Sequence, residues 1–155
     1  MRAIRTFFRL PAALLLLAML AACQTLSGPG LIRSEVTAEL TPESANVIAG
    51  DMVGRLAEKV GPGTTTIELR GSDPLFGPAL EAALREWGYA VITDQVTEGA
   101  AVTPLAYSID PFEGGVLVRL STLRVELTRM YTLNVTGATP ASPLSVMQRG
   151  SEAAS

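Results

Sequence analysis

Apolar residues recur every four positions in the first half of the chain, a spacing typical of an amphipathic helix. This stripe consists of Ile48, Met52, Leu56 and Val60. Thr41 can cap the first turn, Pro42 fits the first helical position, and the glycines of Gly61–Gly63 end the pattern. We therefore expect a helix over residues 42–60.

A second helical stripe is formed by Phe76, Leu80, Leu84 and Trp87. We expect this helix to begin at Asp73–Pro74 or at Gly77–Pro78, because a proline inside a helix removes a hydrogen bond. The whole stripe, Trp87 included, should pack in the core.

Strands are predicted on both sides of the second helix. Residues 64–70 are rich in β-branched side chains between two glycines, and residues 89–93 follow Gly88. A strand, a helix and a strand of these lengths form a crossover in which the two strands are parallel.

The next part of the chain alternates apolar and polar residues, as half-buried strands do. Three such runs, 105–109, 116–120 and 123–133, predict an antiparallel meander. The expected fold class is α+β: two helices on one face of a small mixed sheet, in the order helix, strand, helix, strand, strand, strand, strand. This single domain spans residues 41–136, and we expect both Tyr107 and Tyr131 in its core.

Residues 1–22 are predicted to be an export signal and not part of the fold. Arg2, Arg5 and Arg9 form a positive region, and residues 10–22 are an uninterrupted apolar run. This run is shorter than the ~20 residues that a membrane-spanning helix needs.

Leu20-Ala21-Ala22-Cys23 matches the bacterial lipobox. Signal peptidase would recognise Leu20, Ala21 and Ala22, and Cys23 would receive a diacylglyceryl group and an N-acyl chain such as palmitate. Two or more acyl chains anchor a protein stably, so we expect a lipoprotein held by a flexible tether over residues 23–40. Residue 24 is Gln, whereas an Asp after the lipidated cysteine favours retention in the inner membrane. We therefore expect the protein at the outer membrane, facing the periplasm. The alternative is an ordinary signal peptide with a chance cysteine.

The chain has no histidine, and Cys23 is its single cysteine. His-based catalysis and the usual zinc sites are thereby removed. We expect no catalytic residue, no metal and no cofactor besides the lipid; a hydrolase using carboxylates alone is the enzymatic alternative. The carboxylates off the helix stripes are expected on solvated faces, and they are Asp51, Glu58, Glu81 and Glu86.

The charge of the mature chain also restricts its partners. Loss of the three signal arginines leaves 9 of the 12 basic residues against 15 acidic residues, a formal charge of −6. The basic residues are scattered, whereas nucleic-acid binding needs a concentrated basic face. We therefore expect no direct contact with nucleic acid.

The C-terminal segment, residues 137–155, is rich in Ala, Ser, Pro and Gly and lacks periodicity, so we expect it to be extended or disordered. Three apolar residues stand out in it: Leu144, Val146 and Met147. Such residues can dock on a partner, for example by strand addition. Packing back onto their own domain is an equally weighted alternative.

Seven segments, in their order and spacing, resemble the TrbH family of conjugal transfer lipoproteins. They are Gly63–Leu69, Phe76–Arg85, Gly88–Val91, Leu105–Asp110, Val118–Ser121, Leu127–Tyr131 and Ser142–Met147. The resemblance implies a structural component of a mating-pair formation apparatus, a type IV secretion system that passes DNA between cells. It also implies contacts with the membrane and with other channel proteins, and it is compatible with a ring-forming homo- or hetero-oligomer. The alternative function is an envelope-maintenance lipoprotein that binds peptidoglycan, lipid or a cell-wall synthase.

Overall fold

The computed structural model describes residues 33–62, 65–93 and 102–149. The chain divides into two compact units, Met1–Leu31 and Ile32–Ser155, and all described residues belong to the second. The predicted signal peptide and lipobox lie outside the described residues. The elements of the second unit are, in chain order, β1 (Glu35–Val36), α3 (Pro42–Ala57), β2 (Thr66–Arg70), α4 (Phe76–Glu86), β3 (Ala90–Ile92), β4 (Val102–Phe112), β5 (Gly115–Ser121), β6 (Val125–Asn134), β7 (Gly137–Pro140) and β8 (Ser145–Gln148).

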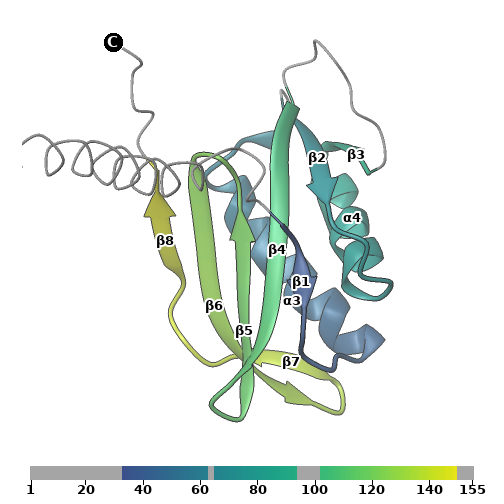
Figure 1. Ribbon diagram of the computed structural model, residues 1–155, viewed down its shortest axis with the longest axis vertical. Helices are drawn as coiled ribbons and strands as arrows, with labels where there is room; N and C mark the ends of the chain where they lie inside the picture. Colours follow the sequence, from purple (N-terminus) through teal and green to yellow (C-terminus); the bar gives the residue numbers. More distant parts are fainter. Residues whose placement is uncertain (1–32, 63–64, 94–101, 150–155) are drawn as a thin grey trace, which may run out of the picture. The chain divides into compact units, whose positions relative to one another are not determined.

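The strands form one mixed sheet in the order β3-β2-β4-β5-β6-β7, with β1 also beside β4 and β8 also beside β6. β2 is parallel to β3 and to β4, β1 is parallel to β4, and the pairs from β4 to β8 are antiparallel. Helices α3 and α4 lie on one face of this sheet (Figure 1). The α+β fold, the parallel strands around α4 and the three-stranded meander are confirmed.

The sheet continues beyond the predicted limits of 41–136 at both ends of the domain. β1 precedes α3, and β7 and β8 follow β6, so one strand is added before the predicted order and two after it. The backbone of 137–140 and 145–148 is extended, as predicted, but both segments pair with β6.

Helix α3 begins where the sequence predicts. The Thr41 side chain accepts a hydrogen bond from the backbone N–H of Ser44, and the Ser44 hydroxyl accepts one from the N–H of Thr41, which forms a capping box. The helix ends at Ala57, three residues before the predicted limit, where the N–H groups of Lys59 and Val60 both donate to the carbonyl of Leu56. Its buried face contains Ile48, Met52 and Leu56 of the predicted stripe, widened by Ala45, Ala49 and Val53, whereas Val60 lies beyond the end of the helix and is half-buried.

Helix α4 begins between its two predicted starts. The Asp73 carboxylate accepts hydrogen bonds from the N–H groups of Leu75, at 3.0 Å, and Phe76, at 2.6 Å. Pro78 is the third helical residue, a position whose N–H would have no partner within the helix, so proline is tolerated there. Trp87 is 48% exposed, so its predicted place in the core is wrong. It follows the last helical turn and lies over Gly54 of α3, where an added Cβ would be 3.1 Å from its ring.

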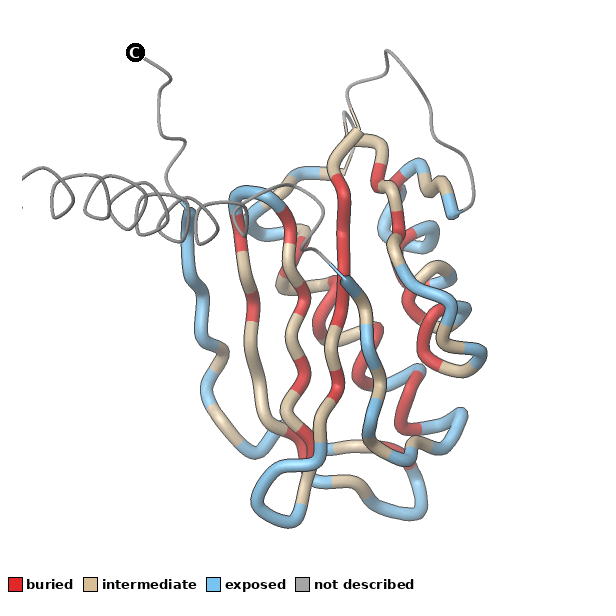
Figure 2. Tube along the Cα trace, in the orientation of Figure 1, coloured by how far each residue is buried: buried red, intermediate tan, exposed pale blue. Residues whose placement is uncertain are grey.

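The core lies between the helices and one face of the sheet (Figure 2). The central strand β5 buries alternate residues, Val116, Val118 and Leu120. Tyr107 and Tyr131 are both buried, as predicted, and the ring of Tyr107 meets that of Phe76 edge-on at a centroid distance of 5.1 Å. Leu123, by contrast, is exposed, because it lies in the turn between the end of β5 at Ser121 and the start of β6 at Val125.

Candidate interaction surface

In the described part of the chain, no group of three or more His, Cys, Asp or Glu side chains is placed to hold a metal ion. None of the described helices is long and apolar enough to cross a membrane. Leu20, Ala21, Ala22 and Cys23 lie outside the described residues, so their roles stay predictions. Two surface features remain as candidates: a pocket at one end of the sheet and the edge strand β8.

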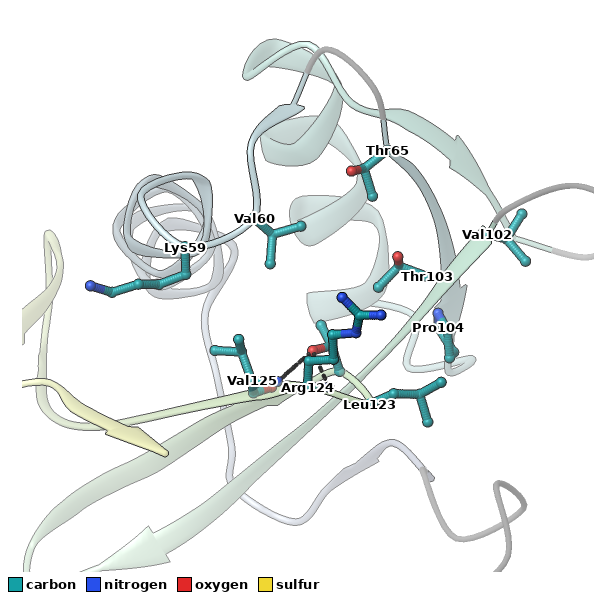
Figure 3. A pocket seen from close by; sticks show the side chains of 10 residues that line it. Lys59, Val60, Thr65, Val102, Thr103, Pro104, Leu123, Arg124 and Val125 are labelled. Atoms are coloured by element: carbon teal, nitrogen blue, oxygen red, sulfur yellow. Dashed lines mark hydrogen bonds between the residues drawn. The ribbon is translucent and has the colours of Figure 1, made fainter. Parts of the chain in front are cut away.

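The pocket lies between the end of α3, the start of β4 and the turn from β5 to β6 (Figure 3). Its volume is about 480 Å³, and it is open on one side. The Arg124 guanidinium points between Val60 and Thr103, whereas the Lys59 side chain extends away from Arg124. No carboxylate is among its lining residues.

The edge strand β8 is built from the C-terminal segment. Its residues pair with the first half of β6, so that Val146 is opposite Leu127 and Met147 is opposite Glu126. Among the described strands, β8 pairs with β6 along one edge, and no other strand pairs with its outer edge. All four residues of β8 are exposed, Val146 at 37% and Met147 at 53%. Leu144, just before the strand, packs against the core.

The backbone groups on the outer edge of β8 can be assigned from one hydrogen bond. The N–H of Arg149 donates to the carbonyl of Arg124 at 2.7 Å. In an antiparallel ladder, hydrogen-bonded and non-hydrogen-bonded pairs alternate, so Met147 bonds to β6 and Val146 does not. The N–H and carbonyl of Val146 therefore point outward, available to a further strand.

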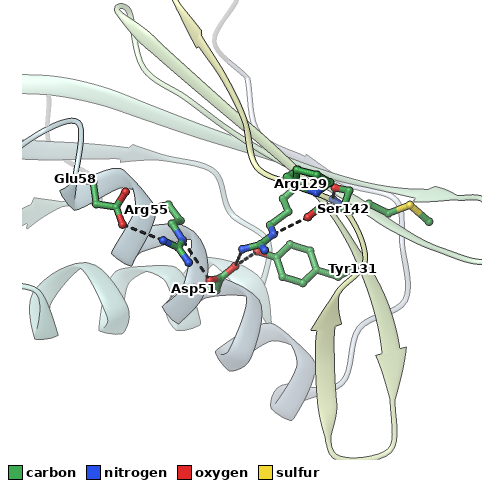
Figure 4. Close-up of polar contacts among 8 residues, drawn as sticks. Asp51, Arg55, Glu58, Arg129, Tyr131 and Ser142 are labelled. Atoms are coloured by element: carbon green, nitrogen blue, oxygen red, sulfur yellow. Dashed lines mark hydrogen bonds and ion pairs between the residues drawn. The ribbon is translucent and has the colours of Figure 1, made fainter.

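A charged contact joins this edge of the sheet to α3 (Figure 4). The Asp51 carboxylate accepts hydrogen bonds from the Arg129 guanidinium at 2.8 Å and from the Tyr131 hydroxyl at 2.6 Å. The side chains of Asp51 and Arg129 are only 24% and 16% exposed, so the predicted solvated position of Asp51 is wrong. Burial, followed by the hydrogen bond to Asp51, raises the pKa of Tyr131 well above its usual range.

The same contact fixes the link between β7 and β8. The Arg129 guanidinium also donates to the carbonyl of Ser142 at 3.0 Å, and the Ser142 hydroxyl accepts from the N–H of Met130 at 2.9 Å. The next backbone bond runs from the N–H of Ala141 to the carbonyl of Met130. β8 is thus attached to β6 by its ladder and, through Arg129, to α3.

The other three carboxylates that were predicted on solvated helix faces, Glu58, Glu81 and Glu86, lie at the surface. Glu81 pairs with Arg85 at 2.7 Å, as their spacing predicts, and Glu58 pairs with Arg55 at 3.0 Å. Glu86 is exposed. Their side chains lie on helix surfaces, where such pairs contribute little to stability.

The family model described as "Conjugal transfer protein TrbH" matches residues 26–150. The chain belongs to the TrbH family. It is 47% identical over 137 residues to a "Probable conjugal transfer protein TrbH" of Sinorhizobium fredii (strain NBRC 101917 / NGR234), a match that covers 85% of this chain and 92% of that protein. No solved structure matches the chain.

Within this TrbH chain, the docking role of Leu144, Val146 and Met147 stays a prediction, and sequence reasoning missed the contact that holds the segment before β8. Asp51 and Arg129 are 78 residues apart, so no local pattern links them. A signal was nevertheless present in the sequence of β6. Val125, Leu127 and Tyr131 are buried at alternate positions, and Arg129 stands at the position between Leu127 and Tyr131 in that series. A charged residue in the register of a buried strand face indicates a partner across the core.

Proposed function

We propose that the chain is a lipid-anchored, non-catalytic assembly subunit of a conjugative type IV secretion apparatus, which binds other channel subunits by strand addition to β8. Membership of the TrbH family supports the link to conjugal transfer. The observation that supports the binding mode is the outer edge of β8, where Val146 presents unpaired backbone groups beside exposed apolar side chains.

A preformed edge suits a binding site because little has to be ordered when a partner arrives. Hydrogen bonds hold Ser142 to β6 and to Arg129, and Leu144 packs against the core, so β8 is fixed from its N-terminal side. A partner strand would gain main-chain hydrogen bonds from Val146 and apolar contacts from Val146 and Met147 on opposite faces.

The membrane anchor is the second part of the proposal. Cys23 would carry the lipid, and the tether before β1 would hold the domain at the periplasmic face of the outer membrane. Its support is the lipobox Leu20-Ala21-Ala22-Cys23 at the end of an apolar run with a positive start. Replacement of Cys23 by serine should abolish acylation and release the protein from the membrane fraction. Retention of this variant in the membrane fraction would refute the anchor.

A proline at position 146 tests the binding mode. Proline has no N–H, but the N–H of Val146 points away from β6, so Val146→Pro should leave the β6–β8 ladder in place. We expect this variant to fold normally, to lose copurification with other envelope-associated transfer proteins, and to fail to restore plasmid transfer in a strain that lacks the gene.

Val146→Ala is the matched control because it retains the outward N–H while shortening the side chain. It should keep most of the transfer that Val146→Pro loses. Normal transfer by Val146→Pro, with an unchanged thermal unfolding midpoint, would show that strand addition at β8 is not used. Normal transfer by the deletion strain, with no second copy of the gene, would refute the role in conjugation and favour envelope maintenance.

A further inference from the structure

β7 and β8 pair with the same edge of β6 but in different registers. Pro140 of β7 is opposite Tyr131, and Val146 of β8 is opposite Leu127. Val146 is thus six positions after Pro140, whereas Leu127 and Tyr131 are only four positions apart. The outer chain has two residues in excess over the same length of β6, which makes the connection between β7 and β8 a β-bulge. Because the excess is even, the side chains of β7 and β8 keep the same alternation between the two faces of the sheet.

Ser142 and Arg129 hold this bulge in place (Figure 4). The N–H of Met130 donates to the Ser142 hydroxyl at 2.9 Å, and that hydroxyl donates to the carbonyl of Pro143 at 3.0 Å. The Arg129 guanidinium donates to the carbonyl of Ser142 at 3.0 Å and to the Asp51 carboxylate at 2.8 Å. Since Asp51 belongs to α3, the bulge is fixed to the helix as well as to the sheet.

On the β7 side of the bulge, the outer edge is a poor template for another strand. The N–H of Ala141 donates to the carbonyl of Met130. The alternation of an antiparallel ladder then turns the backbone groups of Ala138 and Pro140 outward. Proline has no N–H, so Pro140 offers only its carbonyl, and Pro143 within the bulge lacks a donor as well. Prolines and bulges are both means by which natural sheets prevent edge-to-edge pairing.

On the other side of the bulge, the edge is open. The same alternation turns the N–H and carbonyl groups of Val146 and Gln148 outward, because Met147 and Arg149 bond to β6. β8 contains neither a proline nor a charged residue, and its sequence is Ser-Val-Met-Gln. Figure 1 shows that the chain also changes direction at the bulge: β7 crosses the end of the sheet, and β8 runs beside β6. The open edge and the blocked edge are therefore not in line.

We propose that the bulge at Ser142–Pro143 ends the binding edge, so that β8 accepts a short extended segment of a partner chain and excludes the long edge strand of another sheet. This inference rests on the strand addition at β8 proposed above and specifies the kind of partner that fits there. A segment of the same length as β8, which has four residues, can bond to Val146 and Gln148. A longer strand would have to cross the bulge, where the outward groups are displaced and neither Pro143 nor Pro140 provides an N–H.

Hydrogen exchange at single amides tests where the partner segment ends. The acylated protein is compared alone and in complex with the envelope proteins that copurify with it. Exchange at Val146 and Gln148 should slow about tenfold in the complex, because each amide gains a hydrogen bond. Exchange at Ala138, on the far side of the bulge, should stay the same.

The outcomes of this measurement separate the inference from the proposed function. Slower exchange at Ala138 as well as at Val146 would show that the partner strand crosses the bulge, which would overturn the inference and leave strand addition intact. Unchanged exchange at both Val146 and Gln148 would refute strand addition, and the inference with it.

Removal of the bulge tests its role in the protein alone. Deletion of Ser142 and Pro143 removes the two residues in excess and so retains the pairing of β8 with β6. Combined with Pro140→Thr, it gives a continuous outer edge in which every outward residue has an N–H. A long, uninterrupted edge without charges is a template for pairing with a second copy. In the mature chain with Cys23→Ser, this bulge-free variant should self-associate in sedimentation velocity at concentrations at which the parent is monomeric.

Pro143→Ala is the matched control, because it restores an N–H but retains Ser142 and the bulge. It should remain monomeric like the parent. Addition of Val146→Pro to the bulge-free variant should reduce self-association, since it removes an outward N–H from the edge. A bulge-free variant that is folded by thermal unfolding and yet monomeric would overturn the role of the bulge, and so would self-association of Pro143→Ala. If the deletion prevents folding, the hydrogen-exchange comparison decides between the outcomes, because it uses the unaltered protein.

Discussion

Replacement of Tyr131 by phenylalanine isolates one hydrogen bond of the contact between α3 and β6. The side chain is fully buried, and its hydroxyl donates to the Asp51 carboxylate at 2.6 Å. Phenylalanine fills nearly the same space, so no large cavity forms. Hydrogen bonds to charged groups contribute about 1.5–3 kcal/mol. Because Asp51 keeps Arg129 and is 24% exposed to water, we expect the lower part of this range, about 1.5–2 kcal/mol of unfolding free energy.

Urea unfolding followed by circular dichroism gives this free energy directly, and Trp87, the single tryptophan, gives an independent fluorescence signal. Tyr89→Phe is the control: its hydroxyl donates to the neutral carbonyl of Val60, so its loss should cost only about 1 kcal/mol. A double-mutant cycle with Asp51→Asn should recover a coupling between Asp51 and Tyr131. A loss for Tyr131→Phe no larger than that for Tyr89→Phe, with no coupling to Asp51, would refute the charged hydrogen bond.

The same variant has a predicted effect at alkaline pH. Burial and the Asp51 carboxylate raise the pKa of Tyr131 in the folded state, whereas an unfolded tyrosine ionises near its ordinary value of about 10. The folded state therefore retains its proton where the unfolded state loses it, and stability falls as the pH rises above about 10. Tyr131→Phe should weaken this fall without removing it, because burial also raises the pKa of Tyr89 and Tyr107. An unchanged slope of unfolding free energy against pH would contradict this assignment.

Two glycines give opposite predictions for substitution by alanine. Gly50 lies inside α3 with nothing within 4 Å of an added Cβ, so Gly50→Ala should stabilise the protein by about 0.5–1 kcal/mol in urea unfolding. Gly115 begins β5, and an added Cβ there would be 2.3 Å from the backbone oxygen of Tyr131. Gly115→Ala must therefore separate β5 from β6 and should cost about 1–3 kcal/mol; an unchanged thermal unfolding midpoint would show that the strands do not approach so closely.

The elements that the sequence predicts correctly are those specified by local patterns. The stripe of α3 and its cap at Thr41 are both contained within a few turns of chain, and the alternation on β5 marks each buried residue. The strands that the sequence does not reveal lack a pattern of their own. β1 is two residues long and depends on a distant partner, β4. β7 is Gly-Ala-Thr-Pro, with no alternation, and pairs with the second half of β6, which is only two residues away in the chain.

Misplaced side chains have similar causes. Trp87 continues the spacing of the α4 stripe, but the helix ends at Glu86, and the chain turns at Gly88, where φ is +87°. Its ring then rests on α3 at Gly54, half in solvent. Asp51 is off the α3 stripe and would be solvated on an isolated helix. Its burial depends on β6, which no helical periodicity can show.

The position of Arg129 has a consequence for the register of the whole edge. β6 pairs with β5 along one side, and along the other it pairs with β8 through its first half and with β7 through its second half. A slip of β6 by one residue would turn Arg129 to the open face and place Met130 against α3. Asp51 would then lose Arg129 and Tyr131 and keep only its longer ion pair with Arg55, at 3.8 Å, and removal of the main partners of a mostly buried charge is destabilising. The contact at Asp51 therefore excludes the shifted pairing, and in doing so it fixes which backbone groups of β8 face outward.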